Sequence, residues 1–185
     1  TVTGSSVTTK TYDGTTAATI TGGTLVGVVN SDAVSLTQAG TFASANYSAS
    51  AISVTASDSL SGAKAGNYTL TQPTGLSGTI NKAVLTVTAD NKNITYGDLI
   101  PTLTATITGY VNSESSSVLG GAASITTGAV RYSDVGSYTI TPTVGTLTAN
   151  NYSFSYATGS LAVAQKALTV TGSSVTTKTY DGTTA

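Results

Sequence analysis

The stretch KAVLTVTADNKNITYGDLIPTLTATITGYVNSE, residues 82–114, alternates apolar and polar side chains along two short segments. Leu85 and Val87 would share one face of a strand, with threonines on the other face. Leu103 and Ile107 stand opposite threonines in the same way. A pattern with one apolar face and one polar face predicts antiparallel sheets that pack one side on a core.

The same alternation continues beyond this stretch. Tyr152, Phe154 and Tyr156 would share one strand face, and so would Tyr138 and Ile140. Gly, Asn and Asp residues interrupt these segments at regular intervals, as turns require. Good helix formers other than Ala and Leu are scarce. The sequence therefore predicts an all-β chain of many short strands.

The composition restricts the chemistry that the chain can perform. It holds 7 Lys and Arg, 8 Asp and Glu, a net charge of −1, and no His, Cys, Met or Trp. These counts exclude disulfides and thiol nucleophiles, and they give no electrostatic footprint for nucleic acid. No apolar run approaches the roughly 18 residues of a membrane span. We expect no enzyme activity, no catalytic, cofactor-binding or metal-binding residues, no cofactor and no membrane insertion.

A long repeat organises the chain. Residues 1–17 and 169–185 have the identical sequence TVTGSSVTTKTYDGTTA. A weaker repeat of about half that period lies inside, so the chain reads as two related modules and the start of a third. The predicted boundaries are 1–81, 82–165 and 166–185.

Three matches between the two modules support the shorter period. They are Tyr12 with Tyr96, GVVNSD (27–32) with GYVNSE (109–114), and GNYTL (66–70) with NNYSF (150–154). The segments 29–32 and 111–114 suggest the entry to one helical turn between strands, with Asn or Ser as the cap and the acid in the first turn. The alternative is a polar loop.

The tyrosines occupy matched places. Tyr12 and Tyr96 precede a Gly/Asp turn in their modules, and Tyr68, Tyr138 and Tyr152 stand at the starts of strands. The strand-start positions of Tyr68, Tyr138 and Tyr152 favour tyrosines anchored in a core, with the hydroxyl bonded to backbone near a corner. The matched placement of Tyr12 and Tyr96 favours a structural role for them as well. The alternative is a sugar-binding surface.

Oxygen-bearing side chains raise the question of calcium. The segment Asp90-Asn91-Lys92-Asn93 supplies ligand oxygens, but Lys92 interrupts them and no DxDxDG loop occurs. Local capping and turn bonds explain the same residues. We predict no metal site, and whether calcium binds at the module junctions stays open.

Two known families resemble the two modules. Residues 10–23 (KTYDGTTAATITGG) with 60–83 resemble the YDG repeat domain, and residues 82–114 with 134–143 and 150–166 resemble the MBG domain. The resemblance implies immunoglobulin-like β-sandwich modules of large bacterial surface proteins, including adhesins of the filamentous-haemagglutinin type. It also implies a bacterial cell-surface or secreted setting, and it carries no catalytic residues.

Two functions fit these observations. One is a structural spacer, or stalk repeat, in a large adhesin, monomeric and in contact with neighbouring repeats of the same protein. Residues 79–87 hold no Gly, Pro or Ser, so the modules would join stiffly, end to end. The alternative is a binding module that recognises host glycan or protein through end loops at residues 30–32 and 112–117.

The C-terminal copy has no further module to join within the sequence. We expect its apolar side chains Leu168, Val170 and Val175 to lack a core, so that residues 166–185 trail as a free segment. The alternative is that this copy replaces residues 1–17 of a neighbouring chain, since an unpaired strand can extend another sheet.

Overall fold

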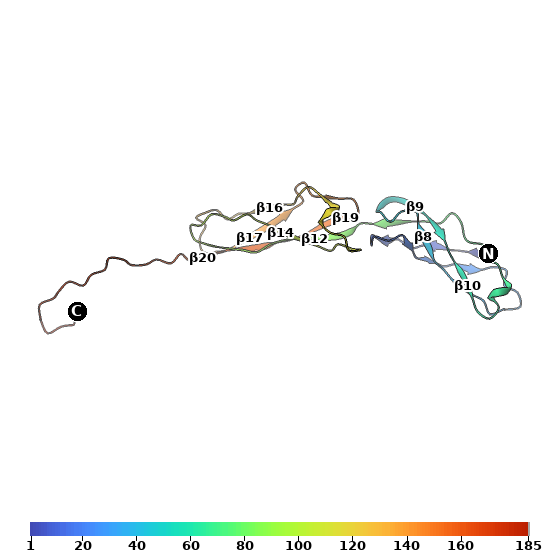
Figure 1. Cartoon of the computed structure of the whole chain (residues 1–185), viewed down its shortest axis with the longest axis horizontal. Coiled ribbons are helices and arrows are strands. Elements are labelled where there is room, and N and C mark those ends of the chain that lie inside the picture. The colour runs from blue at the N-terminus through green and yellow to red at the C-terminus, as the bar shows by residue number, and fades with distance from the viewer. Residues whose placement is uncertain (185) are drawn as a thin grey trace.

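The computed structural model describes residues 1–184 and is all-β, with two short 3-10 helices beside its strands. Figure 1 shows the strands in two groups along the long axis of the molecule. The first group, coloured blue to green, belongs to residues 1–81, and the second belongs to residues 83–164.

The first half contains eleven strands and one 3-10 helix. They are β1 (Val2–Thr3), β2 (Ser6–Val7), β3 (Lys10–Thr11), β4 (Ala17–Ala18), β5 (Ile20–Thr21), β6 (Thr24–Leu25), β7 (Ser35–Thr37), β8 (Gly40–Phe42), β9 (Ser48–Ala56), β10 (Ser59–Ser61), η1 (Ala65–Asn67) and β11 (Ser77–Asn81).

The second half contains nine strands and one 3-10 helix. They are β12 (Ala83–Ala89), β13 (Lys92–Thr95), β14 (Ala105–Thr108), η2 (Ser116–Val118), β15 (Leu119–Gly120), β16 (Ser124–Thr127), β17 (Gly136–Thr143), β18 (Thr148–Ala149), β19 (Tyr152–Ala157) and β20 (Gly159–Ala164).

The main sheets of the two halves share one strand order. The first reads β3-β11-β9-β8-β4 and the second reads β13-β20-β17-β16, so an early strand lies beside the last strand of each half. A third sheet has the order β14-β12-β19, and the remaining strands form pairs. This shared order makes β3 equivalent to β13, and the β8–β9 loop equivalent to the β16–β17 loop.

The expectation of wholly antiparallel sheets is wrong at three strand pairs. The strands β3 and β11, β12 and β19, and β13 and β20 run parallel, while the other pairs are antiparallel. Parallel neighbours need a long connection, and here most of a domain lies between the two paired strands.

The predicted alternation places the core correctly. Leu85 and Val87 on β12 and Ile140 on β17 are fully buried, and Tyr152 on β19 is nearly so. Tyr156 shares the strand face of Tyr152 in sequence but is 40% exposed. The apolar stripe of β19 is therefore covered at the strand start and open near its end.

One hydrophobic cluster crosses the boundary between the halves. Strand β11 ends at Asn81 and β12 begins at Ala83, so Lys82 alone separates them. Buried members of the cluster come from both sides, among them Phe42 and Ile80 from the first half and Leu85 and Tyr152 from the second. The two halves therefore share apolar packing at their boundary.

Residues 165–184 contain no strand. Figure 1 shows this segment leading away from the second half, and Leu168, Val170 and Val175 are at least 88% exposed. Its KTYDGTT sequence still forms the turn seen at the N-terminus: Lys178 pairs with Asp181 at 2.7 Å, as Lys10 pairs with Asp13 at 2.8 Å. This turn is therefore formed by local interactions.

Candidate functional site

Two matched turns carry the acidic residues of the VNSD and VNSE segments. The N–H of Asp32 donates to the carbonyl of Val29, and the N–H of Glu114 donates to that of Val111, both at 3.0 Å. The central residues have positive φ: Asn30 (52°), Ser31 (50°), Asn112 (51°) and Ser113 (60°). Positive φ at both central positions is typical of a type I′ β-turn, so the predicted right-handed helical turn is wrong.

A tyrosine hydroxyl completes each turn. The Tyr152 hydroxyl accepts the Val111 N–H at 3.1 Å and donates to Glu114. In the first half, the Tyr68 hydroxyl accepts the Val29 N–H at 3.2 Å and donates to Asp32 Oδ2 at 2.8 Å. We name each set an acid–tyrosine socket: Val29, Asp32 and Tyr68 form the first socket, and Val111, Glu114 and Tyr152 form the second.

The predicted anchoring of these tyrosines is confirmed at their hydroxyl groups. Tyr152 is 2% exposed, Tyr68 is half-buried, and both hydroxyls bond backbone N–H groups. Tyr138 donates to the carbonyl of Asp134 at 2.9 Å. These contacts give the three side chains structural positions rather than a shared aromatic surface.

The second socket holds a tyrosine from the first half. The Tyr12 hydroxyl donates to Glu114 Oε1 at 2.6 Å, across 102 residues of sequence. Its ring meets Tyr152 edge-on, with centroids 5.5 Å apart, and only 5% of Tyr12 is exposed. Glu114, the only glutamate of the sequence, therefore bridges the two halves, a role that sequence reasoning missed.

Further polar contacts surround this bridge. Asn151 accepts the Tyr47 N–H and donates to Asn46, both at 3.0 Å. Lys82 donates to the Ala149 carbonyl at 3.1 Å, and its Nζ lies 5.1 Å from the centre of the Tyr47 ring. Every one of these contacts lies at the boundary between β11 and β12.

The loop at residues 112–117 begins at this boundary. Asn112 lies so close to Gly14 that a Cβ on Gly14 would come within 2.5 Å of the Asn112 Cβ. Gly14 also has a positive φ of 77°, which favours glycine. The start of this loop is therefore packed against the first half.

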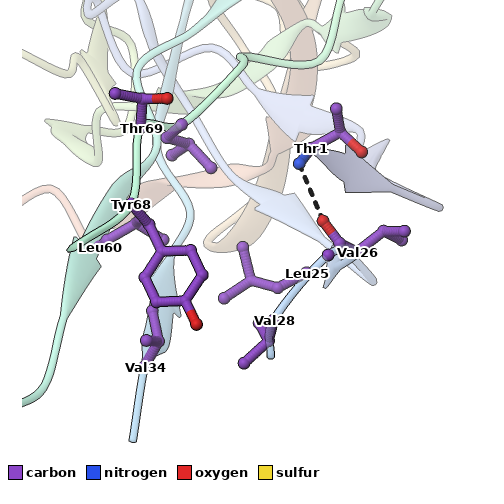
Figure 2. A pocket seen from close by; sticks show the side chains of 10 residues that line it. Thr1, Leu25, Val26, Val28, Val34, Leu60, Tyr68 and Thr69 are labelled. Carbon is purple, nitrogen blue, oxygen red and sulfur yellow. Dashed lines mark hydrogen bonds between the residues drawn. The ribbon is translucent and has the colours of Figure 1, made fainter. Parts of the chain in front are cut away.

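The first socket is less covered than the second, because no other domain within residues 1–184 packs against it. Figure 2 shows Tyr68 beside Val34 and Leu60, with Leu25 and Val28 opposite, and the Thr1 amine donating to the Val26 carbonyl. The cavity among them measures about 20 Å³. That volume suits about one water molecule and lies far below the roughly 300–1,000 Å³ of small-molecule sites.

The bridge changes the ionisation of its two tyrosines. The hydrogen bond to Glu114 and then burial raise the pKa of Tyr12 above its usual value. Burial, followed by the hydrogen bond to Glu114, raises the pKa of Tyr152 to about 12. Both shifts favour the neutral phenol, which can donate to the carboxylate.

We expect the protein to lose stability between about pH 10 and pH 12. Because the folded-state pKa values lie above the unfolded value of 10.0, the folded state binds these protons more tightly. The contribution is complete below pH 10 and is lost as the pH rises through the folded pKa. Urea unfolding at stepped alkaline pH measures it.

A matched pair of variants isolates this alkaline effect. Tyr12→Phe removes one of the two bridging phenols, so the free energy of unfolding should fall less steeply as the pH rises. Tyr132→Phe alters a side chain that is 63% exposed and should leave this pH dependence unchanged. Equal pH profiles for the wild type and Tyr12→Phe would contradict the assignment.

The candidate calcium ligands make local bonds. Asp90 accepts the hydroxyls of Thr104 and Thr106 at 2.6 and 2.8 Å, which lowers the pKa of its carboxyl. Asn91 accepts the Ser160 N–H at 2.8 Å. Across residues 1–184, no three acidic, His or Cys side chains gather as a metal site would require.

Residues 1–184 contain no helix that is long and apolar enough to cross a bilayer.

Two family matches agree with this division of the chain. Residues 1–75 match the YDG domain, and residues 85–162 match the MBG domain of the YGX type. Comparisons with curated proteins and with solved structures gave no match. The chain thus contains a YDG domain followed by an MBG domain, a combination that indicates a repeat module of a larger protein.

Proposed function

We propose that this chain is a spacer repeat in the stalk of a large bacterial surface or secreted adhesin. Each domain would be an immunoglobulin-like β-sandwich, and the two would stand end to end. The repeat would lie outside the cell and hold a distal binding region away from the cell surface. It would act as a monomer, catalyse no reaction and contact the neighbouring repeats of its own protein.

The boundary between the domains carries this proposal. Lys82 is the only residue between β11 and β12, and the buried cluster takes side chains from both domains. Bending at this boundary would expose apolar surface to water and break the Glu114 bridge. A joint of this kind resists motion better than a flexible linker, which is what a spacer needs.

The alternative, a module that binds host glycan or protein through its end loops, has less support. The loop at residues 112–117 begins against Gly14 of the YDG domain. The loop at residues 30–32 stays open. Two hollows flank Tyr68 beside it: the more enclosed one has room for only about one water molecule, and the other, about 360 Å³, is a shallow surface hollow. We therefore favour the spacer.

Small-angle X-ray scattering tests the spacer. The measurement uses a chain that ends at Lys166, so that the following segment adds no length. Each domain should contribute about 35–40 Å, the length of about 10–12 residues of extended chain, so the particle should be elongated. A compact, side-by-side pair would refute the proposal, and specific binding on a glycan array would favour the alternative.

A further inference from the structure

The residues that form the bridge at the YDG–MBG boundary are Tyr12, Glu114 and Tyr152. Each of them has a counterpart at the matching position of the other domain. Tyr12 follows β3, and its N–H donates to the Asn81 carbonyl at the end of β11 at 2.8 Å. Tyr96 follows β13, and its N–H donates to the Ala164 carbonyl at the end of β20 at 2.9 Å. The two tyrosines therefore occupy the same place in sheets of the same strand order.

The two tyrosines differ in how far they are covered. Tyr12 is covered by the MBG domain and is 5% exposed, whereas Tyr96 is 41% exposed. Among residues 1–184, the hydroxyl of Tyr96 has no hydrogen-bond partner. This end of the MBG domain thus has the same strand arrangement as the end of the YDG domain that packs against the MBG domain, but here no following domain of the described chain covers it.

Other exposed apolar side chains lie beside Tyr96 at this end of the MBG domain. The Tyr132 ring lies 6.4 Å from that of Tyr96. The exposed apolar residues that contact Tyr96 or line a hollow with it are Tyr132 (63%) and Val135 (54%), and we name these two and Tyr96 the distal patch. Apolar side chains gathered at the end of a domain are a place where an interaction surface is expected.

The complementary surface lies at the other end of the chain. The first socket repeats the second: Asp32 stands for Glu114 and Tyr68 for Tyr152, with matched turns and matched hydroxyl bonds. In the second socket, Glu114 uses one carboxylate oxygen for each tyrosine. Within the described residues, Asp32 uses Oδ2 for Tyr68, and its Oδ1 accepts no hydrogen bond.

We propose that the distal patch of the MBG domain docks the first socket of a following YDG domain, with the Tyr96 hydroxyl donating to Asp32. The covered YDG–MBG boundary in the same chain supplies the geometry. The sequence identifies the occupant, because residues 169–185 repeat the first seventeen residues of the YDG domain directly after this patch. The proposal deepens the spacer function and rests on it for the continuation of the array.

A tandem chain tests this docking. Residues 1–168 are followed by residues 1–185, which keeps the 168-residue offset of the sequence and gives the inner MBG domain a complete YDG domain after it. Tyr96→Phe in the last copy leaves the inner Tyr96 as the only reporter. Nitration of exposed tyrosines, read by mass spectrometry, then compares this Tyr96 with that of the 185-residue chain.

Docking should slow nitration of the inner Tyr96 about eightfold, the ratio of the 41% and 5% exposed fractions of Tyr96 and Tyr12. Tyr156, which is 40% exposed elsewhere on the MBG domain, provides the reference and should react as before. Equal nitration of Tyr96 in both chains would overturn the proposal.

The substitution Asp32→Arg separates docking from other causes of protection. Placed in the second YDG copy, it should restore nitration of the inner Tyr96. Placed in the first copy, whose socket has no preceding domain in this chain, it should leave Tyr96 protected. Protection that persists with Asp32→Arg in both copies, or that depends on protein concentration, would assign the patch to another occupant and overturn the proposal.

This result and the scattering result are independent. An elongated particle with a fully reactive inner Tyr96 would leave the spacer function standing and remove the docking. A compact particle would remove the spacer, whatever the nitration of Tyr96.

Discussion

Replacing Tyr152 by alanine is expected to lower the free energy of unfolding by about 3–5 kcal/mol, the usual cost of deleting a buried aromatic side chain. The ring is 2% exposed and meets Tyr12 and Tyr110 edge-on, at centroid distances of 5.5 and 6.1 Å. Its hydroxyl also accepts the Val111 N–H and donates to Glu114, and both groups would lose this hydrogen-bond partner. Urea unfolding followed by circular dichroism measures the loss.

Two tyrosines serve as controls for this substitution. Tyr132→Ala alters a side chain that is 63% exposed and should change stability by no more than about 0.5 kcal/mol. Tyr68→Ala alters the matched tyrosine of the YDG domain, which is only half-buried, and should cost less than Tyr152→Ala. A loss below about 1 kcal/mol for Tyr152→Ala would contradict its placement in the core.

The strands and their buried faces could be predicted because they depend on a local pattern. Alternation identifies Leu85 and Val87 as inward, and both are fully buried. The parallel neighbours β12 and β19 could not be predicted this way. Their pairing joins Ala83 to Tyr152, and nothing in either segment specifies the direction of a partner so distant in sequence.

The VNSD and VNSE turns show a second limit. Asn and Ser both favour the start of a helix, and Asn also tolerates the left-handed region, so local preference allows either structure. The tyrosine hydroxyl that bonds Val29 or Val111 comes from about 40 residues further along the chain. This tertiary contact accompanies the left-handed turn in both domains, and no local pattern reveals it.

The candidate site could be predicted only in part. Matched positions identified Tyr12, Tyr68 and Tyr152 as structural residues, but not the groups that they contact. A usable signal was present: the only glutamate, Glu114, occupies the place of Asp32 in the repeat. The contact between Glu114 and Tyr12 belongs to the packing of two domains, which a repeat within each domain does not describe.

Replacing Glu114 by alanine is expected to cost about 2–4 kcal/mol and to loosen the joint between the domains. Two hydrogen bonds to a carboxylate would be lost, and each contributes about 1.5–3 kcal/mol, less than additively when they share an acceptor. The hydroxyls of Tyr12 and Tyr152 would lose that acceptor inside a shared apolar cluster. Urea unfolding measures the loss, and small-angle scattering measures the loosening as a broader distribution of shapes.

A double-mutant cycle shows how much of this loss belongs to the contact between the domains. Glu114→Ala and Tyr12→Phe should be coupled by about 0.5–3 kcal/mol, because each removes one partner of the same hydrogen bond. Asp32→Ala is the matched control: its carboxylate bonds Tyr68 within one domain, so it should show no coupling to Tyr12→Phe. Additive effects of Glu114→Ala and Tyr12→Phe would mean that the bridge contributes nothing across the boundary, and the stiffness of the joint would then have to come from apolar packing alone.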